Sequence, residues 1–530
     1  MSDLLVVGRV HTLDPARPEA EAVLVRDARV AYVGTEAECA RRAAVDAVRI
    51  QGGSVVPGLV DAHGHVQWLG RGRREVTCAG ATSEEACAAR AAERARAAPG
   101  EAWIRGHGWD HNLWPGGRFP THASLTRAVP DRPAVLVRVD GHASWVNARA
   151  LALAGIGRGT PDPPGGRILR AGDGAPTGVL VDAAQELVFT QLPPPTSRQI
   201  EEELLEGMRA LVALGLTEVH DAGVDPAVLD LYRRLAEEDR LPLRVYAMID
   251  GQVSLEALGA ELARWRGRGE LGRLTVRAVK LYADGALGSR GAALHEDYAD
   301  EPGNRGLLLS SRTLLREKVR AVAAAGLQPA VHAIGDRAVS EVLAAFEAAG
   351  DLRALRPRVE HLQIVRAVDL PRLAAVGAVA SMQPAHATAD GLWLAARLGA
   401  GTARLRLAYA WRSVLRAGLP LAFGSDFPVV DPDPRAGLVD AEERTPPGGP
   451  PMSPEQRLSR AEALRAYTAG GAFAAFAEGS RGALREGTDA DLTVFAGDLV
   501  GAAPGEARAL PVLHTIVGGR VEWSAAGAGV

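Results

Sequence analysis

Apolar, β-branched runs alternate with amphipathic stretches through the middle of this 530-residue chain. The runs predict eight strands, at residues 54–66, 216–223, 241–250, 274–285, 327–336, 356–363, 377–386 and 419–429. Helical periodicity separates most of them, most clearly at residues 197–215, 225–240, 311–326 and 336–350. Strands that alternate with helices predict a parallel sheet, and eight such units predict an α/β fold with a (β/α)8 TIM-like barrel. An open, doubly wound sheet is the alternative that gives the same alternation.

Short strands at both ends of the chain predict a second, smaller domain. Residues 1–57 and 480–530 are rich in β-branched runs cut by Gly, Asp and Pro, which predicts one composite β domain. The barrel then occupies residues 58–479. A long insertion at 67–196 follows its first strand, with a helix and a strand of its own between Pro/Gly-rich joints. This insertion is large enough to cover one mouth of the barrel.

Composition and charge exclude several classes of protein. The formal net charge is -4, so the chain lacks the basic excess that nucleic-acid binding requires. No uncharged apolar run reaches the ~20 residues that span a membrane. Cys39, Cys78 and Cys87 form no C-x-x-C pair, and the N-terminus lacks the pattern of a signal peptide. These features predict a cytoplasmic protein with a small-molecule substrate and no nucleic-acid or membrane partner.

Histidine and aspartate residues gather at the ends of the predicted barrel strands, where barrel active sites form. The first strand ends in D-A-H-G-H, so His63 and His65 lie two apart and point to the same side. Packing explains an isolated H-x-H pair as well as metal binding does. Three further strands end in His332, His361 and Asp426, which favours a metal site. Imidazole with carboxylate suits zinc, and also iron or manganese.

The chain contains two lysines, Lys280 and Lys318, among its 60 basic residues. Lys318 falls on a predicted amphipathic helix, and we expect it to be an ordinary surface residue. Lys280 lies among apolar residues of the fourth barrel strand, where a buried ammonium pointing at metal cations would be unfavourable. A lysine amine of lowered pKa can add carbon dioxide and form a carbamate anion whose two oxygens bridge two metals, whereas a guanidinium stays protonated. We therefore expect Lys280 to be carboxylated.

The order of these residues along the strands resembles the ligand pattern of the amidohydrolase superfamily. Its family 3 branch, which includes N-substituted formamide deformylases, is similar in the segments VVPGLVDAHGHV, VKLYADGALGSRGAAL, VHAIGDRAV, RVEHLQ, SMQPAH and FGSDFPV. The resemblance covers nearly the whole chain, including GHGWDHNLWP and DGHASWVNARAL in the insertion and TIVGGRVEW near the C-terminus. It implies a barrel with one or two divalent metals, zinc being the first choice, and a β-sandwich-like domain formed by both termini. Superfamily members are often oligomeric, which leaves a homo-oligomer open.

The resemblance also implies roles for individual residues. His63 and His65 match the ligands of the more buried metal, and Lys280 matches the carboxylated lysine that bridges two metals. His332 and His361 match the ligands of the second metal.

Asp426 matches the carboxylate that contacts metal and serves as general acid and base. Whether one or two metals bind is left open.

Five further positions are candidate substrate contacts. Asp284 and Arg290 follow the Lys280 strand and either orient substrate or cap a loop, and His386 could bond a substrate carbonyl or be an ordinary loop histidine. Trp109 and His142 in the insertion, with Trp114 and Trp145 nearby, either line the pocket or form a small core.

These residues predict a metal-dependent hydrolase in which Asp426 passes a proton from attacking water to a leaving nitrogen. An amide, N-formyl or related carbonyl substrate fits best, and a lactone, ester or carbamate would use the same machinery. A deaminase is less favoured, since related deaminases carry a glutamate three residues after the fifth-strand histidine, where this chain has Gly335. A non-catalytic binding relative should have lost metal ligands, and all six are present.

Overall fold

The computed structural model describes residues 3–111, 114–138, 141, 143–163 and 166–528. The chain divides into two compact units. The first comprises Met1–Val66 and Met208–Val530, and the second comprises Gln67–Gly207. Two helices cross the boundary between these units, α2 (Val66–Arg74) and α7 (Ser197–Ala213).

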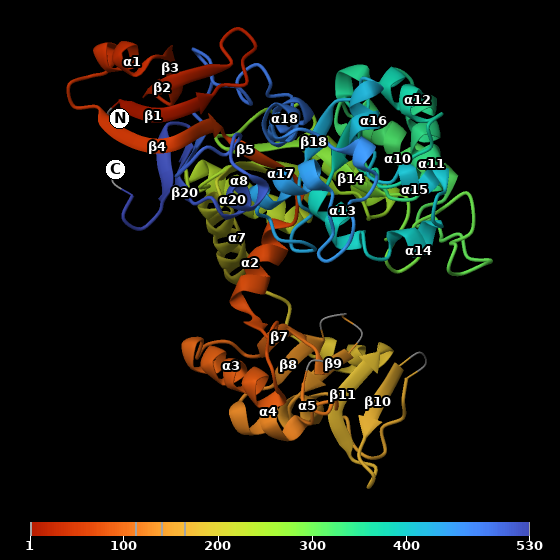
Figure 1. Ribbon diagram of the computed structural model, residues 1–530. Helices are drawn as coiled ribbons and strands as arrows, with labels where there is room; N and C mark the ends of the chain where they lie inside the picture. Colours follow the sequence, from red (N-terminus) through yellow and green to blue (C-terminus); the bar gives the residue numbers. More distant parts are fainter. Residues whose placement is uncertain (1–2, 112–113, 139–140, 142, 164–165, 529–530) are drawn as a thin grey trace. The chain divides into compact units, whose positions relative to one another are not determined.

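An eight-stranded parallel sheet forms the centre of the first unit (Figure 1). Its strands follow chain order: β5 (Leu59–Gly64), β12 (Leu216–Val224), β13 (Arg244–Asp250), β14 (Leu274–Tyr282), β15 (Gln328–Ala333), β16 (Arg358–His361), β17 (Val379–Met382) and β18 (Leu421–Phe423). Helices that follow these strands include α8 (Pro226–Glu237), α9 (Leu255–Trp265), α10 (Arg312–Ala324), α11 (Asp336–Ala348), α12 (Leu370–Ala375), α13 (Pro384–Asp390) and α17 (Pro434–Glu443). The α/β barrel prediction is confirmed, and the open doubly wound alternative is wrong.

The first and last barrel strands approach each other through the segment that follows β18. Asp426 N donates to His63 O over 2.7 Å, and His65 N donates to Phe427 O over 2.9 Å. Gly64 allows this approach, because a Cβ atom there would lie 2.2 Å from the Phe427 ring. Two residues predicted to bind metal, one at each end of the sheet, are thereby held together by backbone bonds.

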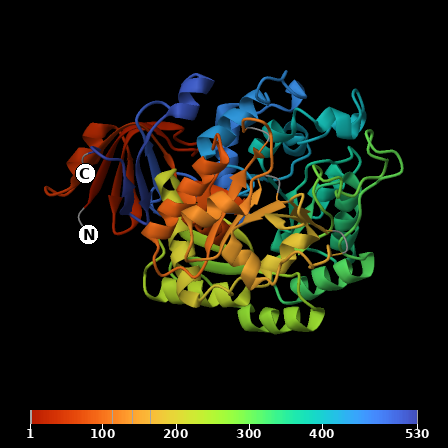
Figure 2. The same ribbon diagram turned by 90° about the horizontal axis from the view of Figure 1, so that it is seen from below.

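Both termini contribute to one seven-stranded sheet, in which red N-terminal and blue C-terminal strands lie side by side (Figures 1 and 2). Its order is β21 (Arg520–Ser524), β20 (Val512–Val517), β19 (Leu492–Phe495), β4 (Val48–Pro57), β1 (Leu4–His11), β2 (Glu19–Arg26) and β3 (Arg29–Gly34). The segment predicted as one strand at 54–66 belongs to two sheets, because β4 ends at Pro57 and β5 begins at Leu59. The sandwich-like form of this domain stays a prediction.

The second unit has its own six-stranded sheet. The order is β10 (Gly166–Arg170), β11 (Pro176–Asp182), β9 (Ala143–Val146), β8 (Ala134–Arg138), β7 (Ile104–Trp109) and β6 (Val76–Thr77). Its helices include α3 (Glu84–Ala97), α4 (His122–Ala128), α5 (Ala148–Leu153) and α6 (Glu186–Phe189). A core that includes Trp109, Trp114 and Trp145 packs within it. Across both units, the helices within the described residues all fall short of the length and apolar character needed to cross a membrane.

Candidate metal centre

Residues from five barrel strands or their carboxyl ends form the candidate site. His63 lies on β5, Lys280 on β14, His332 on β15 and His361 at the end of β16. His65 follows β5 directly, and Asp426 lies three residues beyond β18. The strand pattern therefore delivers these side chains to one end of the barrel, as parallel strands in a barrel require.

Asp426 lies at the centre of three histidines. Its Oδ1 atom is 3.2 Å from His65 Nε2 and 3.6 Å from His63 Nε2, and its Oδ2 atom is 3.8 Å from His386 Nε2. Ligand atoms lie within 4.8 Å of one another in two groups, one of His63, His65 and Asp426 and the other of His361, His386 and Asp426. His386, which the sequence marks only as a substrate contact, is therefore close enough to share the second group.

Several buried imidazole nitrogens in this cluster lie near a carboxylate without forming a hydrogen bond to it. His63 Nε2, His332 Nε2 and His386 Nε2 form no hydrogen bond with any described residue, although each is shielded from solvent. Burial lowers the pKa of His63 to about 4 and that of His332 to about 3. These imidazoles are thus neutral at pH 7 and offer lone pairs, which is the form that binds divalent metal.

Neighbouring side chains fix which nitrogen of each histidine faces the cluster. His63 Nδ1 lies 2.5 Å from Glu360 Oε2, and His361 Nδ1 lies 3.0 Å from Gln383 Oε1. A carboxylate or amide oxygen accepts from Nδ1–H, so Nε2 carries the lone pair. Metal-binding histidines in proteins are commonly oriented by such a second hydrogen bond.

Two of the candidate ligands have left-handed backbone conformations. The φ angle is 75° at His361 and 62° at Asp426, in a region that side chains other than glycine rarely adopt. Such positions cluster at active sites, where the surrounding structure holds a functional side chain in place.

The Asp426 carboxylate is kept ionised. Burial alone would raise its pKa, but the hydrogen bond from His65 and the nearby imidazoles hold it well below the usual range. By contrast, burial raises the pKa of Asp61 to about 7, against hydrogen bonds from Ser425 and from the His63 amide. The Asp61 carboxylate thus links β5 to the segment after β18 through hydrogen bonds from Ser425, whereas the Asp426 carboxylate faces the histidines of the candidate site.

Lys280 is buried at the same end of the barrel. Lys280 is 1% exposed, and burial lowers the pKa of its ammonium group to about 8. Its Nζ atom lies 3.9 Å from the centre of the Tyr282 ring and has no hydrogen-bond or ion-pair partner among the described residues.

The expectation for Lys318 is wrong. It lies on α10, but its residue is 7% exposed, and Nζ donates to Gly251 O over 2.6 Å and to Val253 O over 2.8 Å. A compact ammonium fits between these two carbonyls. Amphipathic periodicity predicted the helix correctly, but not the loop that packs over its polar face.

A buried ionic network continues from His63 into the barrel. Arg358 is fully buried, and its Nε donates to Glu360 Oε1 over 2.7 Å. Arg358 also bonds His220 Nδ1 over 2.9 Å, and His220 Nε2 lies 3.4 Å from Glu218 Oε1. Sequence reasoning missed this network. The alternation of Arg358 and Glu360 with apolar residues predicts a strand with one exposed face, so no local signal shows that both faces are buried.

Asp284 and Arg290 organise a loop. The Asp284 carboxylate is buried and accepts hydrogen bonds from three backbone amides, those of Ala293, Ile334 and Gly335. Arg290 donates to Asp300 over 3.0 Å. Of the two roles that the sequence allowed for these residues, these contacts support the capping of a loop.

The tryptophans of the insertion form a core. Trp109 is fully buried, and its indole N–H donates to Leu136 O over 2.7 Å. Of the two roles that the sequence allowed for Trp109, the structure therefore supports a place in a small hydrophobic core rather than in a pocket wall. His142 lies outside the described residues.

Comparison with known proteins agrees with this geometry. The family model described as "Amidohydrolase family" matches residues 45–522. YtcJ of Bacillus subtilis (strain 168) is 31% identical over 527 residues, covering 97% of this chain and 98% of its own. N-substituted formamide deformylase of Arthrobacter pascens is 30% identical over 542 residues, covering 99% of each. An uncharacterized metal-dependent hydrolase from Pyrococcus horikoshii OT3 has a TM-score of 0.80 and 26% identity, covering 95% of this chain and 99% of its own.

The family model matches residues 45–522, and two relatives are 30% and 31% identical over nearly their full length. The chain therefore belongs to the amidohydrolase family.

Proposed function

We propose that this protein is a metal-dependent hydrolase that cleaves a carbon–nitrogen bond in an amide, N-formyl or related carbonyl substrate. The observation that carries the proposal is the convergence on the ionised Asp426 carboxylate of neutral imidazole nitrogens that form no hydrogen bond with any described residue. Relatives named as a formamide deformylase and a metal-dependent hydrolase support it.

The donor set fits a divalent metal, with zinc as first choice and iron or manganese as alternatives. His63, His65 and Asp426 would hold one ion, and His332 and His361 would hold a second if two are bound. Lys280, with its lowered pKa and no anionic partner, would bridge them as a carbamate formed from its neutral amine and carbon dioxide. A divalent metal lowers the pKa of bound water toward ~7 and polarises a carbonyl group.

The chain itself handles the protons. Asp426 would accept a proton from the attacking water and transfer it to the leaving nitrogen, because its low pKa keeps it ionised before the reaction. His386 would orient the substrate carbonyl through Nε2, which is buried and forms no hydrogen bond with any described residue. An amine is a good leaving group only when it is protonated, whereas the alkoxide of a lactone or ester depends less on this proton transfer.

The environment of Gly335 argues against a deaminase. A Cβ atom there would lie 2.0 Å from Ala293 O, so the loop after β14 occupies the space that a glutamate side chain would need. Lactone, ester and carbamate hydrolysis remain the alternatives at the same site. The small-molecule substrate, the cytoplasmic location and a homo-oligomer also stay predictions.

A hydrolysis screen tests this proposal. The purified chain, loaded separately with zinc, iron or manganese, is assayed against N-formyl, N-acyl, carbamate and lactone compounds. We expect amine release from an N-formyl or N-acyl compound, its loss in His63→Asn, and its retention in His514→Asn on the terminal sheet. A folded, metal-loaded chain that hydrolyses none of these compounds would contradict the proposal.

A further inference from the structure

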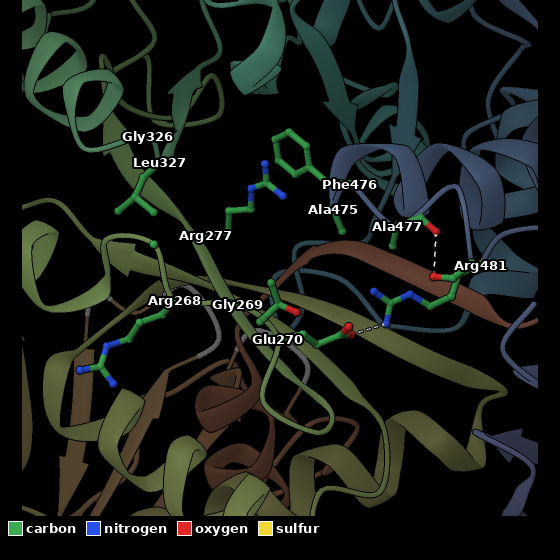
Figure 3. A pocket seen from close by; sticks show the side chains of 13 residues that line it. Arg268, Gly269, Glu270, Arg277, Gly326, Leu327, Ala475, Phe476, Ala477 and Arg481 are labelled. Carbon is green, nitrogen blue, oxygen red and sulfur yellow. Dashed lines mark hydrogen bonds and ion pairs between the residues drawn. The ribbon is translucent and has the colours of Figure 1, made fainter.

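A cavity lies at the end of the barrel strands opposite to the candidate metal centre. It has a volume of about 330 Å³, and residues from the loops before β14 and β15, from the first half of β14 and from the segment after α19 (Gly471–Ala474) line it (Figure 3). Arg277 lies near the start of β14, three residues before Lys280 on the same strand.

The Arg277 guanidinium is held by an aromatic ring, while the nearby Glu478 carboxylate pairs with Arg356 instead. Its Cζ atom lies 3.5 Å from the centre of the Phe476 ring, and Figure 3 shows the side chain reaching toward this ring. Among the residues that the structure describes, none forms a hydrogen bond or an ion pair with Arg277. Stacking on an aromatic face leaves the N–H edge of a guanidinium available for hydrogen bonds.

The charges around the cavity favour an anion. Three arginines line it, Arg268, Arg277 and Arg481, against one acidic residue, Glu270. Glu270 pairs with Arg481 over 3.1 Å, as Figure 3 shows. This pairing leaves Arg268 and Arg277 without a carboxylate in the lining, so the cavity keeps an excess of positive charge.

Arg481 adds a buried cation to the wall. Its side chain is 9% exposed, and its Nε atom lies 3.5 Å from Glu218 Oε2 without a hydrogen bond to any residue that the structure describes. Glu218 also contacts His220, so the positive wall of the cavity rests on a buried ionic network rather than on flexible surface side chains. The cavity thus combines a buried cation, Arg481, with the Arg277 guanidinium, which has no ion-pair partner among the described residues.

We propose that this cavity binds a small anion through the N–H edge of Arg277. Planar, two-oxygen groups such as carboxylate and phosphate match the guanidinium fork. Thr275, two residues earlier on the same strand and also in the lining, supplies a hydroxyl group to the same ligand. The site is separate from the metal centre and does not depend on the hydrolytic function.

Calorimetric titration of the metal-loaded chain tests the site, with inorganic phosphate in one arm and succinate in the other at constant ionic strength. Arg277→Gln should weaken binding at least about tenfold, the loss expected for a bidentate, charge-assisted contact. Arg277→Lys should lie between this variant and the unchanged chain, because a lysine keeps the charge and loses the fork. Arg233→Gln, an exposed change on α8, is the matched control and should bind as the unchanged chain does.

Each outcome decides the proposal. Saturation by phosphate alone identifies a phosphate-bearing ligand, saturation by succinate alone identifies a carboxylate, and saturation by both identifies a general anion site. Binding that is equal in the unchanged chain and in a folded Arg277→Gln overturns the proposal, since the anion then binds elsewhere, including at the metal centre. The absence of binding by either anion at millimolar concentration, or equal losses in Arg277→Gln and Arg233→Gln, also overturns it.

Discussion

Replacing Glu360 by glutamine tests how the barrel holds its candidate metal ligand. The change keeps the size of the side chain but removes its charge. Glu360 is fully buried, and its two oxygens contact His63 Nδ1 at 2.5 Å and Arg358 Nε at 2.7 Å. The variant therefore affects both the orientation of a ligand and the compensation of a buried cation.

The structure gives two expected magnitudes. Removing one partner of a buried ion pair lowers the free energy of unfolding by about 3–5 kcal/mol, because the remaining charge is left without its partner. Arg358 keeps its bonds to His220, Ala62 and Ser381, so we expect a loss near the lower end, about 3 kcal/mol. Loss of the charged partner behind a metal-binding histidine weakens metal affinity by about 10–100-fold.

Two assays separate these effects. Chemical unfolding of the metal-free chain measures stability, and competition with a coloured chelator measures metal affinity. Glu218→Gln is the matched control, since Glu218 is also a buried glutamate with a cationic neighbour, Arg481, at 3.5 Å. It should lower stability and leave metal affinity within about twofold, because it does not contact His63. Unchanged metal affinity in Glu360→Gln, or equal losses in both variants, would refute the positioning role.

Three further predictions concern the lysines and the acid limit of stability. Lys280→Arg should reduce kcat/KM to background, since a guanidinium cannot form a carbamate; activity near that of the unchanged chain would reject the bridging role. Lys318→Arg should lower stability by about 1–3 kcal/mol through overpacking between the Gly251 and Val253 carbonyls while preserving kcat/KM, and an unchanged melting temperature would contradict this. The pKa of Glu218 is lowered from 4.5 to about 2, chiefly by Arg481 against the effect of burial. Its stabilising effect is therefore complete above pH 4.5 and lost as the pH falls toward 2. In Glu218→Gln, the free energy of unfolding should depend less on pH over that range. Identical pH profiles of the unfolding free energy in the variant and in the unchanged chain would exclude the effect.

The barrel and its candidate ligands could be predicted because both leave local signals. Apolar, β-branched runs predicted the eight strands and 3.6-residue periodicity predicted the helices between them. The topology of a parallel barrel then brought His63, His361 and Asp426 to one end. Element boundaries were less accurate where a strand changes partners. No local pattern distinguishes Pro57 in the terminal sheet from Leu59 in the barrel.

Contacts between distant segments could not be predicted. Lys318 has an amphipathic pattern around it, yet the Gly251–Val253 loop buries its ammonium group. Arg358 and Glu360 look like exposed charges until strands close around them. Arg277 and Phe476 lie far apart in sequence, so neither their stacking nor the cavity beside them has a sequence signature.

Metal content tests the central claim most directly. The chain is loaded with zinc, iron or manganese, freed of unbound ions by gel filtration and analysed for metal by plasma mass spectrometry. We expect one or two equivalents per unchanged chain and per His514→Asn chain, and at least one equivalent fewer in a folded His63→Asn/His65→Asn double variant, which keeps His332 and His361. An unchanged, folded chain that retains no metal, or a double variant that retains as much as the unchanged chain, would contradict a metal site at these histidines.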